Sequence, residues 1–127
     1  MSRSSNSGFQ FEDPLTYLPR KSVIEFSKGS VIFNIEHPPE NLFLVILGRV
    51  KLTTIGEDGV QTVSRIVCSE GLFGEAALIG HREGAETAIA LDNATLMSWT
   101  RAEIEQQIER EPRLGIALAQ YLSLIHI

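Results

Sequence analysis

The sequence predicts a mainly β fold, a roll or barrel of short strands with one short helix and further helices at the carboxyl end. Short runs of β-branched and aromatic residues recur at close spacing, turn residues separate them, and the hydrophobic period changes after residue 100. Such spacing is typical of rolls and barrels. With 127 residues, 43% of them hydrophobic, the chain can close one core and is too short for two ordinary domains.

The apolar runs predict the strands. Their expected bounds are Val23 to Phe26, Val31 to Ile35, Leu42 to Leu47, Val50 to Ile55, Thr62 to Val67, Thr87 to Leu91 and Leu96 to Thr100. Gly48-Arg49 is expected to form a tight hairpin turn, and residues 56–59 a second, longer turn. The aromatic residues Phe43, Phe73 and Trp99 are expected in the core.

The last part of the chain has a helical period. Between Arg101 and Glu111, Ile104 and Ile108 fall four residues apart and polar residues fill the other positions, as in an amphipathic helix. Pro112 suits the first position of a new helix. Its apolar stripe is expected to consist of Leu114, Ala117, Leu118 and Tyr121.

Charge and composition argue against several classes of protein. Eleven basic against sixteen acidic residues give a net charge of −5, so this part of the protein is not expected to bind DNA by itself. No apolar run approaches the roughly eighteen residues of a membrane helix, which favours a cytoplasmic location without a membrane partner. The single Cys68 cannot form an internal disulfide, and we expect a buried, inert thiol.

Catalytic and metal-binding patterns are not found. The histidines are His37, His81 and His126, too few to converge as metal ligands inside a roll, and the first two are expected in surface loops. No serine, histidine and acid combination has recognisable nucleophile chemistry. The sequence therefore predicts neither an enzyme nor a metal site.

The most informative stretch runs from Gly71 to Ile79 and is followed by Thr87-Ala88. It is typical of a loop that leads into one short helical turn. Glycines 71 and 74 let the backbone come close to a ligand, and the first helical turn leaves amide N–H groups for it. The sequence thus predicts a candidate site for a small anion near Glu75.

This stretch, between apolar strands and before two helices, resembles the effector domain of the cyclic-AMP receptor protein / fumarate-nitrate regulator (Crp/Fnr) family of bacterial transcription factors. The resemblance covers residues 19–121 and is most specific over residues 41–52 and 71–88. It implies a double-stranded, jelly-roll-like β-roll that binds a cyclic nucleotide, with a short cassette helix. It also implies a homodimer in the full-length protein, with DNA contacted through a carboxyl-terminal helix-turn-helix.

The resemblance also assigns roles to the cassette residues. Gly74 opens the cassette, Glu75 accepts a hydrogen bond from a ribose hydroxyl, Ala76 and Ala77 offer backbone N–H groups to the phosphate, and Thr87 before Ala88 offers its hydroxyl. Where the family has Arg-Ser-Ala or Arg-Thr-Ala, this chain has Glu86-Thr87-Ala88. The charge expected to pair with the phosphate is therefore reversed.

The exchange of arginine for Glu86 has a large expected cost. A lost charge-assisted hydrogen bond is worth about 1.5 to 3 kcal/mol, and a carboxylate near a phosphate adds roughly 1 to 4 kcal/mol of repulsion. The sum corresponds to about two to five decades of affinity. Arg82 could replace the missing cation or neutralise Glu86. A cyclic nucleotide, another small effector and an empty, vestigial pocket all remain open, and no cofactor is predicted.

The expected organisation follows from these observations. Residues 1–18 form a flexible leader and lead-in, residues 19–111 the roll with its following helix, and residues 112–121 the start of a dimerisation helix. Residues 122–127 match the translation of a transposon end used in sequencing libraries, so we expect a native chain that continues differently after Tyr121. The predicted function is the sensory and dimerising domain of a transcription regulator, and the alternative is a stand-alone interaction module.

Overall fold

The computed structural model describes residues 12–79 and 86–125 and contains two compact units. The first, the roll unit, comprises the described residues between Arg20 and Glu103. The second, the helical unit, comprises residues 12–19 and 104–125. Residues 1–11 of the expected leader and lead-in, and the last two residues of the expected transposon-derived tail, lie outside the described residues.

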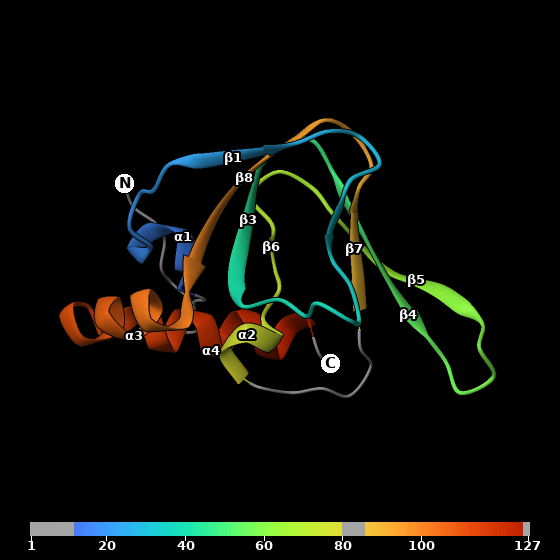
Figure 1. Ribbon diagram of the computed structural model, residues 1–127. Helices are drawn as coiled ribbons and strands as arrows, with labels where there is room; N and C mark the ends of the chain where they lie inside the picture. Colours follow the sequence, from blue (N-terminus) through green and yellow to red (C-terminus); the bar gives the residue numbers. More distant parts are fainter. Residues whose placement is uncertain (1–11, 80–85, 126–127) are drawn as a thin grey trace, which may run out of the picture. The chain divides into compact units, whose positions relative to one another are not determined.

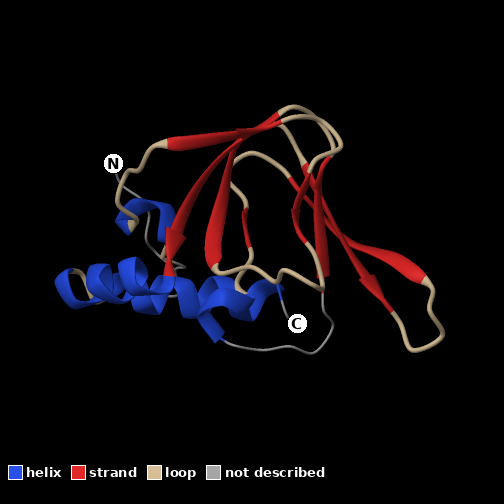
Figure 2. Cartoon of the chain, viewed as in Figure 1, coloured by secondary structure: helices blue, strands red, loops and turns tan. Residues whose placement is uncertain are grey.

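The roll unit consists of two four-stranded antiparallel sheets (Figures 1 and 2). One has the order β1-β8-β3-β6 and the other the order β2-β7-β4-β5. The strand bounds are β1 Val23–Phe26, β2 Val31–Phe33, β3 Asn41–Leu47, β4 Val50–Ile55, β5 Gln61–Val67, β6 Leu72–Phe73, β7 Glu86–Ala90 and β8 Ala94–Thr100. The predicted fold class, a mainly β roll with a short helix and carboxyl-terminal helices, is confirmed.

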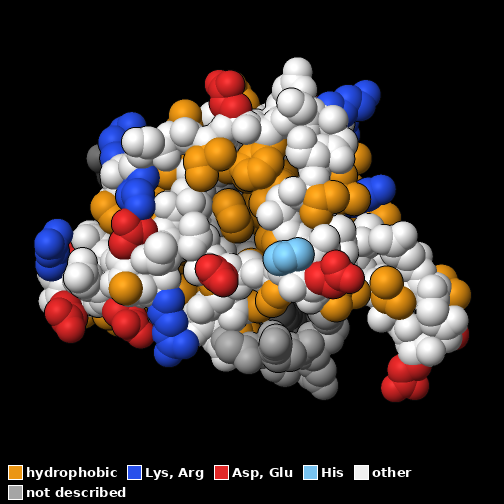
Figure 3. Space-filling view, in the orientation of Figure 1, with side chains coloured by type: hydrophobic (Ala, Val, Ile, Leu, Met, Phe, Trp, Pro, Cys, Tyr) orange, Lys and Arg blue, Asp and Glu red, His pale blue; other side chains and the backbone are white. Residues whose placement is uncertain are grey.

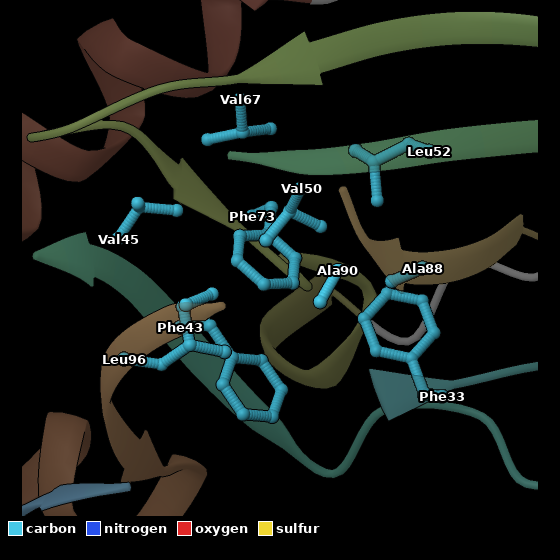
Figure 4. Close-up of a cluster of buried hydrophobic side chains, with 11 residues drawn as sticks. Phe33, Phe43, Val45, Val50, Leu52, Val67, Phe73, Ala88, Ala90 and Leu96 are labelled. Carbon is cyan, nitrogen blue, oxygen red and sulfur yellow. The ribbon is translucent and has the colours of Figure 1, made fainter. Parts of the chain in front are cut away.

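Both sheets contribute their inner faces to one apolar core. Phe43 from β3 and Phe73 from β6 stack with their ring centroids 5.1 Å apart, and Phe33 from β2 lies 6.1–6.2 Å from both. Around the rings pack aliphatic residues of the two sheets, among them Val45, Val50, Leu52, Val67, Ala88, Ala90 and Leu96 (Figure 4). Because the rings bridge the sheets, their burial holds the roll closed.

The turn at Gly48-Arg49 is present, but the prediction that it forms a hairpin was wrong. Strands β3 and β4 belong to different sheets, so the chain crosses from one sheet to the other at this corner. Gly48 has φ +87°, and a Cβ there would lie 2.6 Å from the carbonyl oxygen of Asn93. Arg49 pairs with Asp92 at 2.8 Å and its carbonyl accepts from the Leu91 amide. Packing against the β7–β8 corner therefore decides the path, which local turn chemistry does not reveal.

The true hairpin joins β4 to β5. The Gly56 amide donates to Val60 O at 3.0 Å, and the Gly59 amide donates to Gly56 O at 2.9 Å, so residues 56–59 form the predicted turn. Further along, Thr53 pairs with Val63 but Leu52 pairs with Arg65, which leaves Ser64 as an extra residue in β5. This β-bulge changes which residues of β5 face the interior.

Other expectations differ in detail. Strand β2 ends at Phe33 rather than Ile35, because the Asn34 side chain accepts the His37 amide and starts a turn. Strand β7 ends at Ala90. The two-residue strand β6 and helix α1, Pro14–Tyr17, were not predicted, since neither is long enough to show a period. The expectation of a buried Cys68 was wrong, because this thiol is exposed.

The helices agree closely with the sequence. Helix α2 is Ala76–Ile79, α3 is Arg101–Arg110 and α4 is Arg113–Ile125. Before α3, the Thr100 hydroxyl accepts the Glu103 amide and the Glu103 carboxylate accepts the Thr100 amide, a reciprocal capping box. Three residues of the predicted α4 stripe, Leu114, Ala117 and Leu118, are buried. None of the helices among the described residues has the length and apolarity needed to cross a membrane.

Candidate functional site

Gly74 opens the cassette in a conformation that suits glycine. Its φ is +81°, in the left-handed region that other residues adopt with strain. A Cβ at this position would lie 2.8 Å from the carbonyl oxygen of Asn41 and 3.1 Å from the ring of Phe43. The close approach that requires glycine here is therefore to strand β3. This contact places the turn that follows directly at the edge of the core.

The short helix α2 uses part of its own hydrogen-bonding capacity. The Ala77 amide, expected to be offered to a phosphate, donates to Gly74 O at 3.1 Å. The amides of Leu78 and Ile79 both donate to Glu75 O. Ala76 and Ala77 are half-buried, so the turn itself lies at the surface of the roll rather than inside it.

Glu75 is the buried acid of the cassette. The residue is only 8% exposed, although most glutamates in folded proteins lie in solvent. Its Oε1 atom lies 4.0 Å from Nη2 of Arg65 on β5, and the same Nη2 donates to the Leu72 carbonyl at 2.7 Å. Arg65 thus reaches from one sheet to the start of the cassette in the other. Because a buried carboxylate needs a countercharge, this pair offsets part of the cost of burying Glu75.

The sequence interpretation did not include Arg65. One signal was available: Arg65 stands two residues before the buried Val67, and residues two apart on a strand share a face. A single arginine in a strand, however, is usually exposed. The bulge at Ser64, which decides the direction of the side chain, gives no clear sign in the sequence.

The strand register places the other candidates. Glu86 pairs with Thr54, Thr87 with Thr53 and Ala88 with Leu52 in the antiparallel β4–β7 ladder. Since side chains alternate, Glu86 and the buried Ala88 share one face of β7, and Thr87 lies on the other. Glu86 therefore stands at the end of the inner face, where the resemblance expects the arginine, and the Thr87 hydroxyl does not share that face.

Some candidates lie outside the described residues. Arg82, which the sequence offers as one replacement for the missing arginine, and His81 belong to the segment between α2 and β7 that the structure does not describe. In the part that is described, Gly74, Glu75 and Arg65 come together. Glu86 and Ala88 lie on the inner face of the other sheet.

One face of the molecule brings the apolar interior to the surface. In the space-filling view, apolar side chains gather where Figure 1 shows the space between β3 and β7, and acidic side chains stand near its lower border (Figure 3). Among the described residues, no three His, Cys, Asp or Glu side chains gather as metal ligands. The chemical groups of the candidate site are thus an apolar core, one buried acid and one cation beside that acid.

Comparison with known proteins shows which protein family has these features. The family profile described as "Cyclic nucleotide-binding domain" matches residues 23–111, which include both sheets and the cassette. The chain belongs to this family. Within it, the features described above are those of a Crp/Fnr-type domain with the cyclic nucleotide-binding β-roll.

Members of the cyclic nucleotide-binding domain family similar to this chain include transcription regulators. The chain is 29% identical over 97 residues to a CRP-like cAMP-activated global transcriptional regulator of Mycobacterium tuberculosis, covering 68% of this chain and 43% of that protein. It is 28% identical over 104 residues to the global nitrogen regulator of Synechocystis, covering 80% and 46%. The chain therefore spans less than half the length of these relatives.

The fold of the family is also found among solved structures. The catabolite activator protein of Thermus thermophilus superimposes with a TM-score of 0.74 at 25% identity, over 87% of this chain and 50% of that one. The similarity thus extends over most of this chain and, again, over about half of the longer protein.

Proposed function

We propose that this domain is the sensory half of a Crp/Fnr-type transcription regulator whose DNA-binding half follows Tyr121 in the intact protein. The observation that carries the proposal is the family match to a roll whose relatives are regulators of more than twice the matched length. The net charge of −5 agrees with a sensory part that leaves DNA binding to another domain.

Helix α4 supports pairing of two copies. Beside its buried stripe, α4 leaves the apolar side chain of Ile116 56% exposed, in the part of the helix that precedes the expected tail at residues 122–127. An exposed apolar side chain on a helix is suited to association with a second copy. We propose that α4 begins the helix through which the full-length protein forms a homodimer.

The intact gene provides the test of this function. We expect a basic helix-turn-helix within roughly eighty residues after Tyr121, the span of one small DNA-binding domain. The protein made from the intact gene should be dimeric by light scattering. It should also shift DNA from upstream of its own gene in a gel assay, while the 127-residue chain should not. A stop codon soon after Tyr121 would contradict the proposal and favour a stand-alone interaction module.

We further propose that cyclic AMP is not the ordinary effector of this roll. Glu86 supports this, because it puts a carboxylate on the inner face of β7 where a cyclic nucleotide needs a cation for its phosphate. Calorimetric titration with cyclic AMP and cyclic GMP should give no binding tighter than about 10 μM. Binding tighter than that would overturn this part of the proposal.

A charge reversal tests the position directly. Glu86→Arg should raise the affinity for cyclic AMP at least about tenfold, because it replaces repulsion by a charge-assisted hydrogen bond. Glu57→Arg, the same exchange in the exposed β4–β5 turn, is the matched control and should change little. Equal gains in both variants would mean that only net charge matters.

A further inference from the structure

Arg65 occupies the inner face of its sheet because of the bulge in β5. Across the bulge, the partner of Thr53 is Val63, and the partner of Leu52 is Arg65. Directly paired residues on neighbouring strands share a face, so Arg65 lies on the same face as the buried Leu52. If the register of the β4–β5 hairpin continued without the bulge, Leu52 would pair with Ser64, and Arg65 would pair with the outward-facing Lys51. The bulge thus directs a cation into the roll.

The guanidinium is only partly used by the protein. Nη2 donates to Leu72 O at 2.7 Å and lies 4.0 Å from Oε1 of Glu75, the ion pair described above. Nε is buried and has no hydrogen-bond partner among the described residues. Buried N–H groups nearly always have an acceptor, and those of a charged group all the more. An acceptor that the described part of the chain does not supply is therefore expected at Nε.

The charges around Arg65 make it the one suitable partner for an anion on this sheet. On the inner faces of β2, β4, β5 and β7, as far as these strands are described, it is the only lysine or arginine. Lys51 lies between the buried Val50 and Leu52 and so faces outward. The cation also remains reachable, since 26% of the Arg65 side chain is exposed, against 10% for that of Glu75.

We propose that Arg65 is the cation that holds the effector of this domain, a small molecule with one carboxylate or phosphate group and a hydrogen-bond donor next to it. Nε–H and a neighbouring N–H of the guanidinium form the fork that binds two oxygens of the anionic group. Glu75 accepts a hydrogen bond from the adjacent hydroxyl or amine. This inference rests on the proposed sensory function and gives that function a ligand class.

The ligand class follows from the chemical groups of the pair. The guanidinium of Arg65 offers N–H donors to an anionic group, and the carboxylate of Glu75 can accept a hydrogen bond from a donor beside that group. A ligand with a second anionic group toward β7 would meet Glu86 on the inner face. Small size is expected because the clustered phenylalanine rings occupy the core close to the pair, with Phe73 two residues before Glu75.

Simple anions test the proposal on the 127-residue chain. Glycolate and acetate carry the same carboxylate with and without a neighbouring hydroxyl, inorganic phosphate represents the other oxyanion, and chloride controls for ionic strength. Such small probes are expected to bind with a Kd of about 1 mM or weaker. The melting temperature should rise saturably with glycolate or phosphate, and glycolate should act at lower concentration than acetate.

Variants locate the binding. Arg65→Gln should weaken the binding of the effective anion at least tenfold, while Arg49→Gln, the removal of an exposed arginine paired with Asp92, should leave it unchanged. Arg65→Lys, which keeps the charge but not the fork, should fall between them. Glu75→Gln should reduce the advantage of glycolate over acetate. Equal responses of Arg65→Gln and the unaltered chain would overturn the proposal.

A direct measurement covers the case in which Arg65→Gln does not fold. The Nε–H resonance of Arg65 in the unaltered protein should move on titration with glycolate or phosphate and not with chloride. No movement with either anion would also overturn the proposal. These outcomes do not depend on what the intact gene encodes after Tyr121. Anion binding without a DNA-binding domain would refute the regulator function and support the anion site. A DNA-binding domain without anion binding would support the regulator function and refute the anion site.

Discussion

Two neighbouring regions of the roll differ in the kind of side chains that they bury. The phenylalanine cluster of Phe33, Phe43 and Phe73 buries apolar rings against one another, and these rings require no hydrogen-bond partners. The corner formed by Arg65 and Glu75 begins within two residues of Phe73, yet it contains a charged pair and a buried N–H that has no hydrogen-bond partner in the described part of the chain. The apolar region can therefore supply most of the stability, while the polar corner can respond to a ligand.

Among the variants that test this comparison, removal of a central phenylalanine ring should cause the largest loss of stability. Phe73→Ala is expected to lower the free energy of unfolding by about 3 to 5 kcal/mol, because Phe73 is fully buried between the two sheets. Urea unfolding followed by circular dichroism measures the loss. Ile35→Ala, at a half-exposed position, is the control and should cost much less. A similar loss in both variants would mean that the cluster has no special place in the stability of the roll.

Replacement of Gly74, which lies between the two regions, should cause the second largest loss of stability. Gly74→Ala adds strain at a positive φ and a clash with the Asn41 carbonyl, together about 2 to 4 kcal/mol. Gly59→Ala has the same φ of +81° but no atom within 4 Å of the added Cβ, so it should cost only about 1 to 2 kcal/mol. The difference in urea unfolding between the two variants isolates the close approach. Equal losses would show that backbone strain alone requires Gly74.

The polar corner should show coupling rather than a large net contribution. Arg65→Met alone should destabilise the protein by about 1 to 2 kcal/mol, because Glu75 then loses its buried countercharge. Adding Glu75→Leu should recover most of that loss, since an apolar pair of similar volume replaces the ions. A double-mutant cycle by urea unfolding gives the coupling energy. Additive losses would separate the two side chains and weaken the case for a joint site.

The exposed pair at the start of α3 should give the smallest effect and a clear pH dependence. The hydrogen bond from Lys21, together with that from the Thr100 amide, lowers the pKa of Glu103 below its ordinary 4.5. A lowered folded pKa means that the contribution is complete above about pH 4.5 and is lost as the pH falls through the folded value. Being exposed, it should stay below about 1 kcal/mol.

Nuclear magnetic resonance titration of the Glu103 carboxyl checks this prediction. In Lys21→Met, the pKa should move up toward its ordinary value, and the stability difference between this variant and the unaltered chain should shrink at low pH. Glu57, in the β4–β5 turn, provides a comparison carboxyl away from the pair. An unchanged Glu103 pKa in Lys21→Met would assign the shift to the capping box instead.

Much of the fold could be predicted because its signals are local. Strands β1 and β4 have their predicted bounds, and the spacing of Ile104, Leu114 and Leu118 predicted the two long helices. The short strand β6 could not be found, because two residues carry no period. The crossing at Gly48-Arg49 was mistaken for a hairpin, since the same turn residues serve both and only packing against Asn93 separates them.

The candidate site was predicted only in part. Gly74 and Glu75 were found through their spacing, and the exchange at Glu86 through the resemblance. The partner of Glu75 was missed because it comes from β5, and because the bulge at Ser64 that turns Arg65 inward depends on the pairing of two strands. Arg82, which was considered as a replacement cation, lies outside the described residues, so its role stays a prediction.

The sequence by itself determined the strand and helix segments, the turn chemistry and the charge change at Glu86, since each depends on residues close in the chain. Tertiary structure alone decided that β3 and β4 lie in different sheets and that Arg65 meets Glu75, ten residues further along. The physical reason is that propensity and period act over a few residues. Which charge is buried beside which, in contrast, depends on the register of strands that the core brings together.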